Sequence, residues 1–116
     1  MLSGYLVGCS QRAENAPVDA EKARNTLKVA LESWKNGDAV DALQQASPPI
    51  YVVDAQWQSG AKLVDFKIVN DGECKDANLF CPVQLSIKNA KGKVESMQVT
   101  YIIATAPNLA VSRKLF

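Results

Sequence analysis

The most informative segment for the fold is Leu31-Glu32-Ser33-Trp34-Lys35-Asn36-Gly37-Asp38. It ends a run of apolar residues with a glycine, the residue that most often follows the last turn of a helix. Upstream, apolar residues recur every three or four positions from Ala20 to Trp34, and Asp19 is a good N-cap. The pattern predicts an amphipathic helix over residues 20–36, with Trp34 on its buried face.

After this helix the pattern changes to short strands. A second, shorter helix is expected over residues 39–45, and Pro48-Pro49 end it because the residue before a proline disfavours the helical conformation. Alternation and β-branched content predict strands over residues 50–53, 62–69, 82–89, 94–105 and, as a short edge strand, 111–115. In residues 62–69 the alternation places Val64, Phe66 and Ile68 on one face. Helices followed by antiparallel strands define an α+β fold, here a helix packed on a curved sheet of about four strands.

Composition limits the classes of function. The chain has 116 residues, a formal net charge of +1 and 47% hydrophobic residues, which suits one globular domain over residues 19–116. Its 13 basic and 12 acidic residues are interspersed, so no basic stripe indicates a nucleic-acid partner. Histidine, the commonest general base and metal ligand, is absent. We therefore expect no metal site and no cofactor.

Two cysteines lie close together in the second half of the chain. Cys74 and Cys81 form an even pair if the third cysteine, Cys9, is used otherwise. In an oxidising compartment such a pair forms a disulfide, and a loop this short would add about 2.5 kcal/mol in the chain-entropy model. Two free thiols and a metal or redox site are the alternatives, and the metal site lacks further ligands.

A small set of residues suits acid–base chemistry. An isomerase-type site needs a carboxylate base and a hydroxyl donor in one pocket, for which Asp54 or Asp65 and Tyr51 or Tyr101 are the candidates. Each also has a structural interpretation. Asp54 is a cap before a turn, Asp65 lies on a solvent face, and Tyr101 fills the core with its hydroxyl near the rim.

Trp57 lies in a turn beside Gly60 and is the candidate for a partly exposed, ligand-facing side chain. Trp34, on the apolar face of the first helix, is expected in the core. Removing Trp57 is therefore expected to destabilise the domain less than removing Trp34.

The order of elements resembles two superfamilies. A helix that ends in Trp34-Lys35-Asn36-Gly37, followed by Trp57-Gln58-Ser59-Gly60 and long hairpin strands, is similar to cystatin-like and nuclear-transport-factor-2-like domains. The resemblance covers residues 20–115 and implies a sheet that curls around the helix. Such domains include isomerases and dehydratases as well as inhibitors and binding modules, so the fold alone does not choose between enzyme and binding module.

The N-terminus resembles a bacterial lipoprotein. Leu6-Val7-Gly8-Cys9 is similar to a lipobox, and the polar residues 10–18 that follow suit a tether. The resemblance implies that residues 1–8 are the remnant of a signal peptide and that Cys9 carries the lipid. Because Ser10 is not the aspartate that retains lipoproteins at the inner membrane, it implies the periplasmic side of the outer membrane in a two-membrane host. The alternative is an incidental cysteine in an apolar N-terminus.

Two hypotheses follow. The first is a non-catalytic binding or interaction module of the cell envelope, attached to the membrane by its lipid and taking an unknown protein or small molecule. The second is a small-molecule isomerase or dehydratase with an Asp/Tyr site. An apolar cavity into which an aspartate and a tyrosine converge would favour the enzyme.

Overall fold

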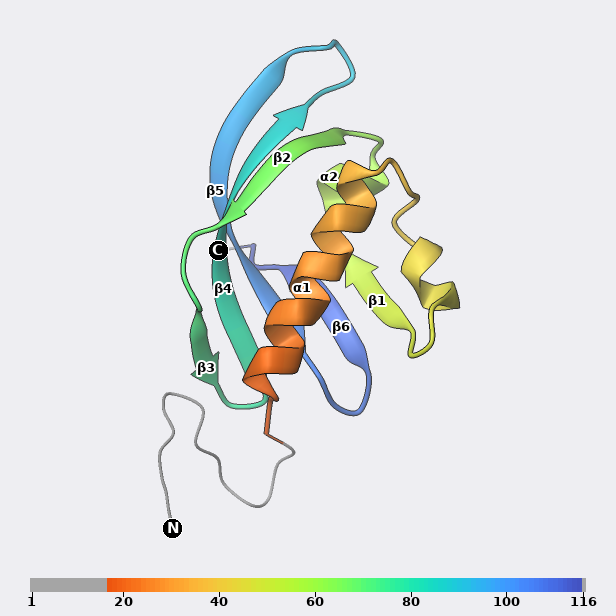
Figure 1. Cartoon of the computed structure of the whole chain (residues 1–116). Helices are drawn as coiled ribbons and strands as arrows, with labels where there is room; N and C mark the ends of the chain where they lie inside the picture. The colour runs from red at the N-terminus through yellow and green to blue at the C-terminus, as the bar shows by residue number, and fades with distance from the viewer. Residues whose placement is uncertain (1–16, 116) are drawn as a thin grey trace.

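Figure 1 shows a helix lying against a curled sheet, in a computed structural model that describes residues 17–115. Among the described residues, no helix is long and apolar enough to cross a membrane. The helices are α1 (Ala20–Lys35), the 3-10 helix η1 (Ala42–Gln45) and α2 (Ala55–Gln58). The strands are β1 (Ile50–Val53), β2 (Lys62–Ile68), β3 (Glu73–Lys75), β4 (Asn78–Lys88), β5 (Val94–Ala104) and β6 (Leu109–Arg113). The predicted α+β class is confirmed.

The sheet is larger than expected and is mixed. Within residues 17–115 the sheet has six strands. Five of them lie in the order β1-β6-β5-β4-β2, and the sixth, β3, pairs with β4. All neighbours are antiparallel except β1 and β6, which are parallel. The prediction of about four antiparallel strands was therefore wrong in number and in type. A parallel pair needs a long crossover, here residues 54–108, and no local sequence pattern reveals it.

Both ends of α1 are set by local sequence, as predicted. At its start, the Asp19 side chain accepts a hydrogen bond from the Lys22 backbone N–H at 3.0 Å. At its end, the N–H groups of Gly37 and Asp38 donate to the carbonyls of Trp34 and Ser33, which is a Schellman motif. Gly37 has a φ of 91°, a conformation that glycine adopts without steric strain. The second helix was overpredicted, since only the 3-10 turn η1 forms.

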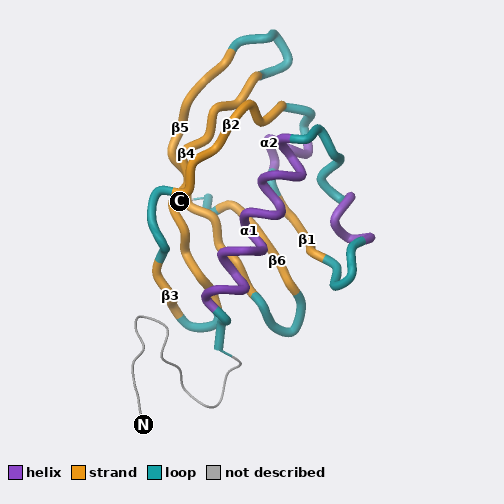
Figure 2. The backbone as a smooth tube through the Cα atoms, in the orientation of Figure 1, coloured by secondary structure: helices purple, strands orange, loops and turns teal. Residues whose placement is uncertain are grey.

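The core lies between α1 and the hollow face of the sheet, which forms a half-barrel around the helix in Figure 2. Leu27, Leu31 and Trp34 enter it from α1, while Tyr101 and Ile103 enter it from β5. The alternation in residues 82–89 predicts Val83, Leu85 and Ile87 on the inner face of β4, and all three are buried. The strand begins earlier than predicted, and Leu79 and Cys81 continue the same buried face. Val18, expected in the tether, is also part of this core.

A β-bulge changes the faces of β2. The pairing with β4 shifts register between Leu63 and Asp65. Leu63 is buried at 3% exposed, whereas Val64 is 45% exposed. The predicted inner face holds for Phe66 and Ile68, which pack against the core, but was wrong for Val64. The extra residue in the bulge reverses the alternation, which a strict period of two cannot predict.

Candidate functional site

Two tryptophans stack against each other at the C-terminal end of α1. Trp34 comes from the last turn of α1 and Trp57 from α2. Their ring centroids are 5.4 Å apart and their planes are 7° from parallel. An aromatic pair of this kind contributes about 0.5–1.5 kcal/mol beyond the apolar area it buries. The stack therefore fixes α2 against the end of α1.

Hydrogen bonds fix the orientation of both rings. Trp34 Nε1 donates to the carbonyl of Ala61 at 2.8 Å. Trp57 Nε1 donates to the carbonyl of Asp38, also at 2.8 Å. Ala61 follows α2, the helix of Trp57, and Asp38 follows α1, the helix of Trp34. Each ring is therefore held by the segment that follows the helix of the other tryptophan. Since an indole has no second donor, the pair presents only apolar ring surface to its surroundings.

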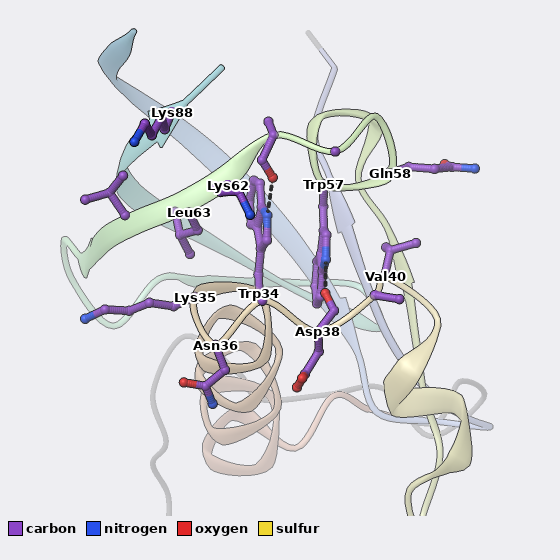
Figure 3. Close-up of a pocket in the computed structure, with 15 residues that line it drawn as sticks. Trp34, Lys35, Asn36, Asp38, Val40, Trp57, Gln58, Lys62, Leu63 and Lys88 are labelled. Atoms are coloured by element: carbon purple, nitrogen blue, oxygen red, sulfur yellow. Dashed lines mark hydrogen bonds between the residues drawn. The ribbon is translucent and has the colours of Figure 1, made fainter. Parts of the chain in front are cut away.

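A cavity of about 590 Å³ lies beside this pair (Figure 3). In the close-up, its residues come from the end of α1, from α2, from β2 and from the end of β4. Its lining includes Trp34, Lys35, Asp38, Trp57, Lys62, Leu63, Val64 and Lys88. The volume is in the range of small-molecule sites, roughly 300–1,000 Å³.

Positive charge gathers around the cavity. Three lysines and one aspartate line it, although the whole chain has a net charge of only +1. Asp38 accepts a hydrogen bond from the Ser33 hydroxyl at 2.7 Å. Lys35 Nζ lies 3.2 Å from Asp65 Oδ1, and this bond lowers the pKa of the Asp65 carboxyl. Lys62 and Lys88 are directly opposite each other in the pairing of β2 with β4.

A second polar cluster lies in the core and does not line this cavity. The Tyr101 hydroxyl donates to Asp54 Oδ2 at 2.5 Å, and Arg113 Nη2 donates to the same oxygen at 2.9 Å. Asp54 Oδ1 caps α2 by accepting from the backbone N–H groups of Gln56 and Trp57 at 3.0 and 3.3 Å. Gln56 also accepts a hydrogen bond from Arg113 Nη1. The cluster joins the end of β1 and the start of α2 to β5 and β6.

The carboxylate and the hydroxyl of this cluster are buried. Asp54 and Tyr101 are each 1% exposed. Burial raises the pKa of the Tyr101 hydroxyl, and the charge of Asp54 raises it further, so the tyrosine stays neutral. Both carboxylate oxygens of Asp54 already accept two hydrogen bonds each. A general base must lie within hydrogen-bond distance of the proton it takes, and the donors nearest to this carboxylate are protein groups.

The structure therefore brings together two of the four candidate residues for acid–base chemistry. Asp54 and Tyr101 are in contact, but the Tyr101 hydroxyl is buried rather than at the rim. Tyr51 is 42% exposed on β1 and belongs to neither site. Asp65 is exposed and pairs with Lys35.

Trp57, the candidate for a ligand-facing residue, is 6% exposed and so is a core residue, yet it also lines the cavity. That it faces a ligand stays a prediction.

The cysteine predictions have different outcomes. Cys9 lies outside the described residues. Cys81 is a free thiol in the core, and burial raises its pKa. Cys74 is opposite Leu79 in the pairing of β3 with β4, so Cys74 and Cys81 are diagonal neighbours on one face. Diagonal neighbours are roughly 7–8 Å apart, which is long for a disulfide. The bridge between Cys74 and Cys81 stays a prediction.

Sequence reasoning missed several residues that matter here. Arg113 reads as a solvated residue of an edge strand, but β6 is flanked by β1 and β5, and the Arg113 side chain is only 14% exposed. Lys62 and Lys88 carry no signal in the sequence, because their opposition depends on which strands pair. The alternation of charged and apolar residues along a strand does not encode that pairing.

Comparison of the chain with protein-family models, with curated proteins and with solved structures gives no match. Within residues 17–115, no group of three or more Cys, Asp or Glu side chains is placed to hold a metal ion.

Proposed function

We propose that this protein is a binding module of the cell envelope, tethered by a lipid on Cys9, that takes a small molecule in the cavity beside Trp34 and Trp57. The observation that carries the binding part is the cavity itself. It combines a floor of two rigid tryptophans with lysines at its edge, which is the mixture of apolar wall and few polar groups typical of ligand sites.

The fold supports the same proposal. The sheet curls around a helix that ends in Trp34-Lys35-Asn36-Gly37, as the resemblance to cystatin-like and nuclear-transport-factor-2-like domains implies. We propose that the domain belongs with these superfamilies. In such a domain the hollow of the sheet is the natural place for a ligand, and the cavity lies at the end of that hollow.

The tether would orient the cavity. Because Val18 is part of the core, the tether is residues 10–17, and a segment of that length reaches at most about 29 Å. The cavity lies at the opposite end of α1, and a helix of 16 residues spans about 24 Å. An acylated Cys9 would therefore hold the domain close to the membrane, with the cavity at the end of α1 away from the tether.

The alternative function is an isomerase or dehydratase that uses Asp54 and Tyr101. Their contact at 2.5 Å is the observation in its favour. Against it, the two groups bond each other and Arg113 instead of facing the cavity, and the cap on α2 occupies the second carboxylate oxygen. We favour the binding module because the cluster, as arranged, holds structural elements together.

Nuclear magnetic resonance tests the binding function directly. The chain has two tryptophans, and both indole rings line the cavity, so their two N–H resonances report on it. At least one compound from a mixed library of anionic, neutral and cationic fragments should shift both resonances in a saturable way.

A matched pair of variants gives the control. Val64 and Val69 are similarly exposed, at 45% and 43%, but only Val64 lines the cavity. Val64→Phe should weaken binding of the hit compound, and Val69→Phe should leave it unchanged. A library in which no compound shifts either resonance would reject the proposed binding function.

A further inference from the structure

The pairing of Lys62 with Lys88 is the starting point. The two residues are in register on neighbouring antiparallel strands, and both line the cavity. The Cβ atoms of such a pair are roughly 4.5–5.5 Å apart, and like charges in this position repel each other. The arrangement places two positive charges at one side of the cavity.

Neither charge is neutralised within the described chain. Among residues 17–115, the ion pairs within 4.0 Å are Lys35 with Asp65 and Arg113 with Asp54. The one carboxylate that lines the cavity, that of Asp38, is hydrogen-bonded to Ser33. An anion held between Lys62 and Lys88 would remove their repulsion and gain charge-assisted hydrogen bonds from both.

The rest of the cavity suits an apolar body. Both indole N–H groups are occupied by backbone carbonyls, so the tryptophans offer no hydrogen bond to a ligand. Val64, turned outward by the bulge in β2, is 45% exposed on the wall beside Lys62. Trp34 and Trp57 are 2% and 6% exposed, so Val64 supplies most of the open apolar surface. An apolar group that covers Val64 gains about 25 cal/mol for each Å² removed from water.

We propose, resting on the binding function above, that the ligand is an amphiphilic anion. Its acidic group lies between Lys62 and Lys88, and its apolar body lies along Val64 and the stacked tryptophans. The class includes acyl and aryl carboxylates and their phosphate counterparts.

Decanoate is the probe, compared with 1-decanol, acetate, decyl phosphate and decylammonium. Calorimetry and tryptophan fluorescence measure binding to the full chain, and none of these probes absorbs where tryptophan is excited. Decanoate should bind at least about tenfold more tightly than 1-decanol, since a charge-assisted hydrogen bond contributes that factor or more. Acetate and decylammonium should bind far more weakly. The ratio of decyl phosphate to decanoate shows which acidic group the lysine pair prefers.

Three variants locate the anion. Lys62→Gln and Lys88→Gln should each weaken decanoate binding about tenfold while changing 1-decanol binding little. Lys67→Gln is the matched control, because Lys67 is an exposed lysine of the same strand as Lys62 that does not line the cavity. It should bind decanoate as the unaltered chain does. All three positions are exposed, so folding should persist, and circular dichroism checks this.

The outcomes separate this inference from the proposed function. If fragments shift the tryptophan resonances but decanoate and 1-decanol bind equally, the cavity binds ligands and the anion preference is wrong. The anion preference is also wrong if Lys67→Gln weakens decanoate binding as much as Lys62→Gln does, because the effect is then one of overall charge. If no compound of either experiment binds, the binding function itself fails.

Discussion

Trp34 stacks on Trp57 with ring centroids 5.4 Å apart and planes 7° from parallel, although one belongs to α1 and the other to α2. The two side chains are similarly buried, at 2% and 6% exposed. Each also donates a hydrogen bond to the backbone beside the other's helix. The two side chains therefore act as one unit in the core. The prediction that Trp57, as a residue of a turn, is partly exposed and matters less for stability than Trp34 does not fit this packing.

The first prediction concerns this unit. Trp34→Ala and Trp57→Ala should each lower the free energy of unfolding by about 3–5 kcal/mol, as truncation of a buried aromatic does. The double variant should lose about 0.5–1.5 kcal/mol less free energy of unfolding than the sum of the two single losses, because the contribution of the stacked pair is lost only once. Urea denaturation of the three variants measures both. A Trp57→Ala variant that loses less than about 1 kcal/mol would show that the stack does not form.

The second prediction concerns the cluster around Asp54. Asp54→Asn leaves Arg113 without its buried partner and weakens the cap of α2, so unfolding should become easier by about 3–5 kcal/mol. Asp65→Asn removes the carboxylate of the other ion pair, which is exposed, and should change stability far less. Thermal and urea unfolding compare them. Equal effects would mean that Asp54 is solvated rather than buried against Arg113.

The third prediction concerns pH. The pKa of Tyr101 is raised by burial and by the Asp54 charge, so the folded state favours the neutral hydroxyl. This stabilisation is complete below the unfolded-state pKa of about 10 and is lost as the pH rises through the raised pKa of the folded state. In the folded protein, Tyr101 should therefore contribute nothing to the tyrosinate absorbance at about 295 nm when the pH is near 10.5, just above the ordinary tyrosine pKa.

Two variants provide the comparison for this titration. Tyr101→Phe should leave the absorbance change of the folded protein unaltered. Tyr51→Phe should reduce it, because Tyr51 is 42% exposed to solvent. If the two variants reduce the absorbance change equally, Tyr101 is open to solvent.

The fourth prediction concerns Cys81. Its thiol is free and buried, and burial raises its pKa, so alkylation should be slow in the folded protein and fast in urea. Mass spectrometry of peptides from protein kept without reductant measures the labelling of each cysteine. Cys81 that resists alkylation in urea until a reductant is added would instead be in a disulfide, and a disulfide-linked peptide pair would identify Cys74 as its partner.

The fifth prediction concerns the tether. In a bacterial host that acylates lipoproteins, the protein should incorporate radioactive palmitate and partition into detergent. Cys9→Ser should abolish both, because the lipobox resemblance makes Cys9 the acylated residue. Cys74→Ser is the matched control and should keep the label. Label that survives in Cys9→Ser would overturn the lipid anchor and leave the cavity proposals standing.

Features that depend on near neighbours along the chain could be predicted from the sequence. The start and end of α1 follow from Asp19 and Gly37, since caps are interactions within one turn. The apolar period placed Leu27, Leu31 and Trp34 on one face, and strict alternation found the buried face of β4. These predictions succeeded because a period of 3.6 or 2.0 residues is a property of the local backbone, whatever packs against it.

Contacts between distant residues depend on the packing of the whole domain and could not be predicted. The bulge in β2 turned Val64 outward, and the parallel pairing of β1 with β6 brought Arg113 to Asp54 and Tyr101. The opposition of Lys62 and Lys88 depends on the register between β2 and β4, which are separated by the β3 hairpin. Register and strand order minimise the free energy of the whole core rather than of any one segment. The cavity and its charges are therefore products of packing that no single stretch of the chain specifies.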